Sequence, residues 1–155
     1  MKRMLLDNAE YLEQLKDVVE NSGLNWKCLD KKSVMVTGAA GMLGSGMVDL
    51  LIYLNEHTDL TVNIYALGRT ESKLKQRFLA FADKPYFHII TMDISTEMHM
   101  EEDVDYIIHA ASNADPAMMA KYPVDTLLAN VVGINNLLDL AYRNNAQRVL
   151  NVSSG

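Results

Sequence analysis

A glycine-rich loop between a predicted strand and a predicted helix constrains the fold of this chain more than any other feature. Gly38, Gly41 and Gly44 have the spacing G-x-x-G-x-x-G, between an apolar run over residues 34–37 and helical spacing over residues 42–55. The first glycine permits a tight turn, and the second lets the backbone approach a pyrophosphate at the positive end of the helix. The third lets the helix pack closely on the sheet. This placement predicts a dinucleotide-binding loop, and the alternative is a turn that only needs flexible residues.

Strand and helix patterns alternate along the rest of the chain. Strands alternating with helices imply βαβ units, so we expect an α/β fold. The expected architecture is a Rossmann-type doubly wound parallel sheet of about five strands in the order 3-2-1-4-5. The β-branched and aromatic runs that predict the further strands lie at residues 60–67, 86–92, 105–109 and 146–152.

Helical spacing at both ends of the chain adds two expectations. A helix over residues 4–21 predicts an N-terminal helical extension, residues 1–30, before a Rossmann domain over residues 31–155. A long helix after Pro123 contains Asn130, which falls within its apolar spacing and there needs a hydrogen-bond partner. The expected buried face of that helix consists of Leu127, Val131, Ile134, Leu138 and Ala141.

Composition narrows the function classes. The 155 residues suit one domain, and the net charge of -6 argues against a nucleic-acid or anionic-membrane surface. No apolar run approaches the roughly 18 residues that cross a bilayer. The single cysteine, Cys28, excludes an intrachain disulfide, and we expect it to be a small buried apolar residue of a cytoplasmic protein. The four histidines lack ligand spacing, so no metal is expected.

With Thr37 in front, the loop TGAAGMLG resembles the TGxxGxxG loop of the short-chain dehydrogenase/reductase superfamily. More specifically, the chain resembles the NAD(P)-dependent epimerase/dehydratase family that acts on nucleotide sugars, over about residues 31–155. Three further motifs occur in the family's order: Asp93-Ile94 after the third strand, HAAS at residues 109–112, and VSSG at residues 152–155.

The loop and the resemblance together imply a set of cofactor-binding residues. In the family, an acid at the place of Asp93 lies near the adenine, small residues after the fourth strand line the nicotinamide ribose, and an Asn at the place of Asn130 braces the active-site strands. The alternatives are that Asp93 only forms a turn, that Ala110 to Ser112 only close a strand, and that Asn130 is structural. The full set is Thr37, Gly38, Ala40, Gly41, Met42, Leu43, Gly44, Gly68, Arg69, Thr70, Asp93, Ile94, His109, Ala110, Ala111, Ser112, Asn130 and Ser153.

The end of the second strand favours NADP over NAD. NAD-preferring sites usually place Asp or Glu there to hold the ribose hydroxyls, whereas this strand ends in Gly68 followed by Arg69. An arginine can bind the 2′-phosphate of NADP through two charge-assisted hydrogen bonds. Thr70, Ser72 and Lys73 can add contacts. In the alternative, Arg69 stacks on adenine or points to solvent, and NAD binds.

The resemblance also implies a reaction. Family members oxidise a sugar hydroxyl and pass hydride to the nicotinamide, with a Tyr base from a YxxxK helix and a Ser or Thr that holds the substrate oxygen. Ser154 matches that Ser or Thr, but no tyrosine here has a lysine four residues later.

We therefore expect the parent protein to be a nucleotide-sugar epimerase, dehydratase or reductase, and a homo-oligomer. The chain as given is expected to bind the cofactor without turnover. The alternatives are a non-catalytic NADP-sensing module and an interaction fragment that binds nothing.

Overall fold

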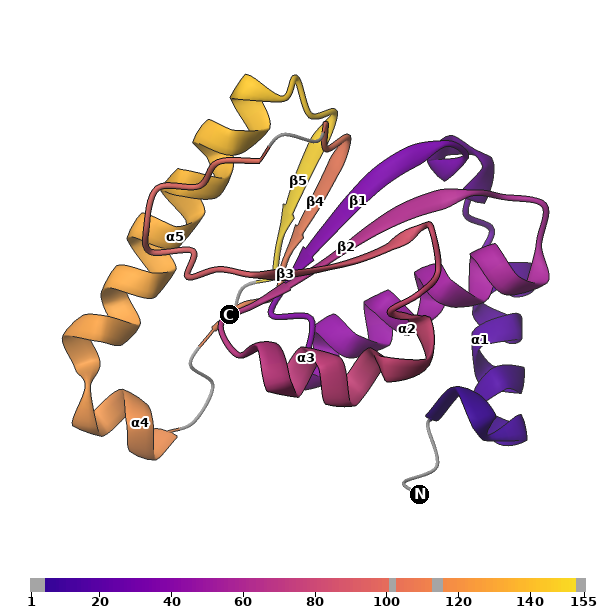
Figure 1. Ribbon diagram of the computed structural model, residues 1–155, viewed down its shortest axis with the longest axis horizontal. Coiled ribbons are helices and arrows are strands. Elements are labelled where there is room, and N and C mark those ends of the chain that lie inside the picture. Colours follow the sequence, from indigo (N-terminus) through magenta and orange to yellow (C-terminus); the bar gives the residue numbers. More distant parts are fainter. Residues whose placement is uncertain (1–4, 101–102, 113–115, 153–155) are drawn as a thin grey trace.

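The computed structural model describes residues 5–100, 103–112 and 116–152. Helices separate the strands from β1 to β5, except between β3 and β4, where the described residues form no helix (Figure 1). Three helical segments precede β1. In chain order the elements are η1 (Leu5–Asp7), α1 (Ala9–Asn21), η2 (Trp26–Leu29), β1 (Lys32–Thr37), α2 (Met42–His57), β2 (Val62–Gly68), α3 (Glu71–Phe78), η3 (Leu79–Phe81), β3 (Phe87–Thr91), β4 (Tyr106–His109), α4 (Pro116–Lys121), α5 (Pro123–Arg143) and β5 (Arg148–Asn151).

The five strands form one parallel sheet in the order β3-β2-β1-β4-β5, which confirms the predicted Rossmann-type topology. In the register, Thr37 at the end of β1 lies between Leu67 of β2 and His109 of β4. The carboxyl ends of these strands are therefore level at one edge of the sheet. The strand order reverses between β1 and β4, and parallel sheets bind ligands outside the carboxyl ends at such a point.

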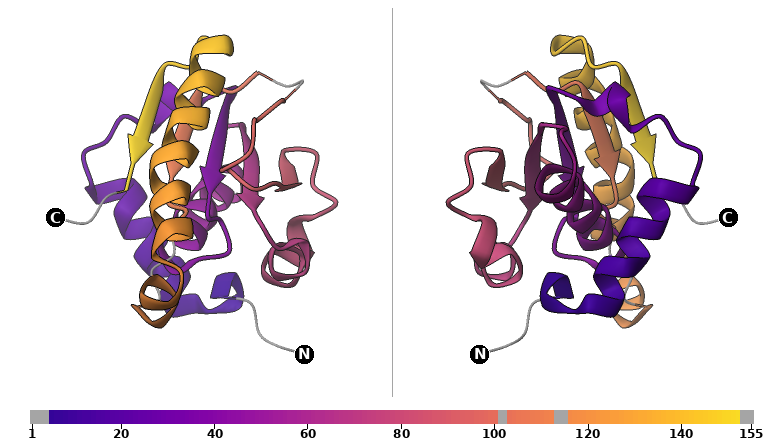
Figure 2. Two further views of the ribbon diagram at one scale, coloured as in Figure 1. Left: turned by 90° about the vertical axis from the view of Figure 1, so that its left-hand side faces the viewer. Right: turned by 90° about the vertical axis from the view of Figure 1, so that its right-hand side faces the viewer.

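Helices cover both faces of the sheet. Figure 2 shows α5 across one face and α1 with α2 on the other. Side chains of β1 alternate between the two cores: Val36 packs in one cluster with Val48 of α2, and Met35 in another with Leu137 of α5. Because both faces are covered, the last four residues of β1 are all buried.

Residues 5–31, which precede β1, form helical segments that are tied to each other and to the core. Asn8 caps α1, its Oδ1 accepting from the backbone amides of Glu10 (2.9 Å) and Tyr11 (3.3 Å). The indole of Trp26 donates to the carbonyl oxygen of Val19 at 2.9 Å and so ties η2 back to α1. Leu15 of α1 is buried.

The predicted buried face of α5 is wrong for three of its five residues. Leu127, Val131 and Leu138 are 62%, 58% and 51% exposed, and Asn130 lies exposed among them. Ala141 is buried as predicted, and Ile134 is half-buried. The other residues of α5 that contact the sheet core are Gly133, Leu137 and Leu140. The helix carries two apolar stripes, and periodicity alone does not indicate which stripe faces the sheet.

Cys28 is exposed, which contradicts its expected burial. In the single turn of η2, Trp26 and Leu29 pack against the core, so Cys28 between them faces outward. Among the helices of the described residues, none combines the length and apolar character that a bilayer crossing needs.

Candidate functional site

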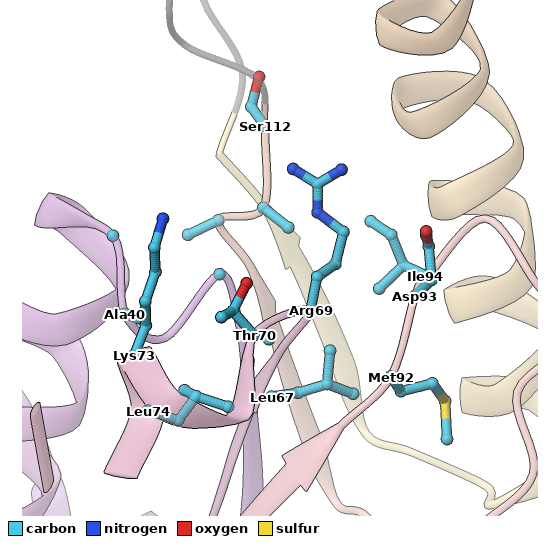
Figure 3. A pocket seen from close by; sticks show the side chains of 15 residues that line it. Ala40, Leu67, Arg69, Thr70, Lys73, Leu74, Met92, Asp93, Ile94 and Ser112 are labelled. Carbon is cyan, nitrogen blue, oxygen red and sulfur yellow. The ribbon is translucent and has the colours of Figure 1, made fainter. Parts of the chain in front are cut away.

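Loops that follow β1, β2, β3 and β4 surround a pocket of about 280 Å³ at the carboxyl edge of the sheet. Figure 3 shows side chains from these separate loops directed into one space. The volume of the pocket lies just below the range of roughly 300–1,000 Å³ for small-molecule sites, so the pocket has room for a small ligand or part of a larger one. The pocket lies where the strand order reverses, as expected for this topology.

The glycine loop forms one wall of the pocket from backbone alone. Gly38 has φ +67°, and a Cβ there would lie 2.6 Å from the carbonyl oxygen of Ala110. A Cβ on Gly44 would overlap the carbonyl oxygen of Gly38. Gly41 is the N-cap of α2 and offers no side-chain cap to the amides of the first turn. These amides and the helix dipole fit a phosphate group placed beside Ala40 and Gly41.

Most of the predicted site residues meet in this pocket. Its lining includes Gly38, Ala40, Gly41, Gly68, Arg69, Thr70, Asp93, Ile94, Ala110, Ala111 and Ser112. The others lie elsewhere. Met42 and Leu43 are exposed in the first turn of α2, and Asn130 is exposed on α5. Thr37, Gly44 and His109 are buried, whereas Ser153 and Ser154 lie outside the described residues. That each binds the cofactor or substrate stays a prediction.

The pocket also has apolar lining that the sequence analysis missed: Leu67, Leu74 and Met92. Figure 3 shows Leu67 and Leu74 below Thr70. A signal was present for two of them. Met92 directly precedes Asp93. Leu74 follows Thr70, the N-cap of α3, by one helical turn, so Thr70 and Leu74 lie on the same side of that helix.

Two cationic side chains reach into the pocket. Figure 3 shows Arg69 and Lys73 extended in the same direction on either side of Thr70. Within the described residues, no group of three or more His, Cys, Asp or Glu side chains could hold a metal ion. The polar chemistry of the pocket therefore suits an anionic organic ligand.

Asp93 has two roles at once. Its Oδ1 accepts from the backbone amide (2.9 Å) and hydroxyl (2.7 Å) of Ser95, as the turn interpretation expects, while the residue also lines the pocket. These hydrogen bonds from Ser95, with the nearby charge of Arg69, lower the pKa of Asp93. The carboxylate is therefore ionised at neutral pH beside the pocket.

Thr37 and His109 tie the ends of β1 and β4 together behind the glycine loop. Thr37 Oγ1 lies 2.7 Å from His109 Nδ1, and both residues are buried. Burial lowers the pKa of His109, so the imidazole is neutral at pH 7. The two side chains bind each other rather than facing the pocket.

We expect Thr37→Val to destabilise the fold by about 1–3 kcal/mol, because it leaves a buried imidazole nitrogen without its partner. Thr126→Val is the matched control, since the buried hydroxyl of Thr126 donates only to the carbonyl of Tyr122 in its own helix (3.0 Å). Urea unfolding of both variants at pH 7.5 measures the difference. Equal losses of unfolding free energy would show that the Thr37–His109 pair does not stabilise the sheet.

Comparison with known proteins shows which family the chain belongs to. The model of the NAD dependent epimerase/dehydratase family matches residues 34–155. UDP-glucuronic acid decarboxylase 2 of Arabidopsis thaliana is 36% identical over 78% of this chain and 25% of its own length. UDP-glucuronic acid decarboxylase 1 of Danio rerio is 32% identical over 78% of the chain and 27% of its own length.

Solved structures give the same fold. A UDP-galactose 4-epimerase aligns with a TM-score of 0.64 at 22% identity, over 79% of this chain and 38% of that one. A dTDP-glucose 4,6-dehydratase variant from Streptomyces venezuelae with NAD bound aligns with a TM-score of 0.62 at 22% identity, over 78% of this chain and 39% of that one. This chain thus spans between a quarter and two fifths of the length of these proteins. The family match covers most of the chain, which therefore belongs to the NAD-dependent epimerase/dehydratase family.

Proposed function

We propose that this chain is the NAD(P)-binding portion of an oxidoreductase-type enzyme that acts on a nucleotide sugar. The observation that carries the proposal is the backbone cradle of Gly38, Gly41 and Gly44 at the point where the strand order reverses. The cradle adjoins a pocket whose walls come from four strand ends. The bound nicotinamide would accept and return a hydride at a sugar carbon.

Each part of the pocket has a role in this proposal. The first turn of α2 holds the pyrophosphate beside Gly38 and Gly41, which carry no side chain. Gly44 lets the helix pack against the backbone of Gly38. Leu67 and Leu74 form an apolar surface for the adenine, beside the turn at Asp93. Ala110 and Ala111 after β4 leave room for the ribose of the nicotinamide half.

We infer a preference for NADP from the charges at the end of β2. Gly68 occupies the place of the acid that would repel a 2′-phosphate, and Arg69 and Lys73 extend into the pocket near it. A guanidinium can donate two hydrogen bonds to the phosphate, and the ammonium adds a second positive charge.

The cofactor proposal predicts a selective effect of Arg69. The unaltered chain should bind NADPH more tightly than NADH, and Arg69→Met should weaken NADPH binding by roughly 10- to 100-fold while changing NADH binding little. Lys75→Met is the control, because Lys75 is exposed on α3 and pairs only with Glu71 (2.6 Å) among the contacts described. Titration followed by nicotinamide fluorescence measures the affinities of all three proteins for both nucleotides.

The outcomes of this titration separate two claims. Tighter binding of NADH by the unaltered chain, or equal losses of affinity for both nucleotides in Arg69→Met, would overturn the preference for NADP and leave the proposed function standing. Binding of neither nucleotide would overturn the proposed function itself.

The substrate class and reaction are proposed from the relatives. The curated relatives named above are UDP-glucuronic acid decarboxylases, and a structural neighbour is a UDP-galactose 4-epimerase. We infer that the whole protein acts on a nucleotide-activated sugar, with Ser154 holding the reacting oxygen and Ser153 beside it. The chain by itself is proposed to bind the cofactor without turnover. Self-association and a cytoplasmic location stay predictions.

A further inference from the structure

A buried carboxylate joins the N-terminal helices to the Rossmann core. Asp49 of α2 is fully buried, and its Oδ2 accepts from the hydroxyl of Tyr11 at 2.9 Å. The same oxygen forms an ion pair with Arg77 of α3. Its Oδ1 has no hydrogen-bond partner among the described residues. A buried charge is tolerated only where it is paired, so these two donors are the groups that hold Asp49 in place.

The pair between Asp49 and Arg77 connects the two helices that open at the pocket. The first turn of α2 follows Gly41, and α3 follows Thr70, and both of these residues line the pocket. Lys73 also lines the pocket, and it precedes Arg77 by one turn of α3, so the two share a side of the helix. The pair therefore fixes the spacing between two walls of the pocket.

Tyr11 adds a third helix to this connection. It belongs to α1, which lies against α2 on the side away from α5 (Figure 2). Burial and the adjacent Asp49 raise the pKa of Tyr11 to about 12, so the phenol keeps its proton and donates across the physiological range. The family model begins at residue 34, so this contact comes from a part of the chain outside the family match.

We propose that Tyr11 is a positioning residue for the cofactor pocket: through Asp49 and Arg77 it holds α3 against α2 and so sets where Thr70 and Lys73 stand. The inference rests on the proposed cofactor site. It assigns the N-terminal helices a role in cofactor affinity in addition to stability. Tyr11 itself does not touch the pocket.

Tyr11→Phe tests the proposal because it removes one hydroxyl and leaves the ring. Tyr86→Phe is the matched control: Tyr86 also donates to a carboxylate, Glu56, which a cation, Lys84, also binds at 2.9 Å. That pair lies at the amino end of β3, at the opposite edge of the sheet from the pocket. NADPH titration and hydrogen exchange of the α3 amides are measured on both variants at a temperature where each is folded.

We expect Tyr11→Phe to raise the Kd for NADPH by about three- to tenfold and to speed exchange in α3, with Tyr86→Phe close to the unaltered chain in both. A Kd in Tyr11→Phe equal to that of the unaltered chain, or an equal rise in both variants, would overturn the inference and leave the proposed function standing. Absence of binding by the unaltered chain would overturn both.

Arg77→Lys tests the positioning proposal if Tyr11→Phe does not fold. This substitution keeps a positive charge beside the Asp49 carboxylate but loses the fixed geometry of the guanidinium. The proposal expects a similar rise in Kd. An unchanged Kd in Arg77→Lys would contradict it.

Discussion

Gly44→Ala should lower the free energy of unfolding by at least about 2–3 kcal/mol and abolish measurable dinucleotide binding. A Cβ at this position would overlap the carbonyl carbon and oxygen of Gly38, and both partners are backbone. The helix must therefore move away from the strand end, which opens the cradle at the first turn of α2. Chemical unfolding and NADPH titration of the same preparation measure the two effects.

Gly46→Ala is the control for Gly44→Ala, two residues further along the same helix. Beyond the nearby backbone of α2 itself, a Cβ on Gly46 would meet no atom of the described residues within 4 Å. Alanine is favoured over glycine in a helix interior, so this variant should be more stable by about 0.5–1 kcal/mol and bind normally. If Gly44→Ala were as stable as Gly46→Ala, the close packing of helix on strand would not require glycine at residue 44.

Arg77→Met should destabilise the fold by about 3–5 kcal/mol at neutral pH, because it leaves Asp49 buried with only Tyr11 as a partner. Burial raises the pKa of Asp49, and the charge and hydrogen bond of Arg77 and the hydrogen bond from Tyr11 lower it in part. Loss of Arg77 raises that pKa further. Ionised Asp49 then destabilises the folded state above its raised pKa, and the deficit shrinks as the pH falls toward the ordinary value of 3.8. Urea unfolding between pH 8 and pH 4.5 measures this trend.

Two further variants check the mechanism of this loss. Lys75→Met, which breaks an exposed pair on the same helix, should cost only about 0.3–0.5 kcal/mol. Asp49→Asn combined with Arg77→Met should recover part of the stability, because the buried charge is gone. A deficit in Arg77→Met that does not change with pH would show that lost packing, and not the buried carboxylate, is its cause.

The order of the strands and the glycine loop could be predicted because their signals are local. Apolar, β-branched and aromatic runs placed each strand within a few residues, and their alternation with helical spacing implied a parallel sheet, which the structure confirms. Gly38, Gly41 and Gly44 stand at fixed distances along one loop, so their spacing reports their geometry directly. The pocket residues after β3 and β4 were implied by the family resemblance, and Gly68 and Arg69 after β2 by the usual place of the ribose-binding acid. They meet in one pocket because parallel strands end at one edge.

Other features depend on contacts between distant segments. Leu127 and Leu138 have the same spacing as a buried face, yet the sheet packs against the stripe of Leu137 and Leu140 instead. Cys28 lies between two residues that face the core and is itself exposed. In each case the sequence shows which residues are apolar, and only the packing of neighbouring elements decides which of them are covered.

The sequence by itself determined the parallel α/β sheet, the position of the glycine loop and the absence of an acid after β2. The tertiary structure alone decided that Arg69 and Lys73 reach into one pocket, and that Tyr11 and Arg77 meet on Asp49. The physical reason is the distance along the chain between the residues that interact. Backbone conformation and helix caps follow from neighbours within a few residues, whereas the partner of a buried charge is set by where whole helices dock.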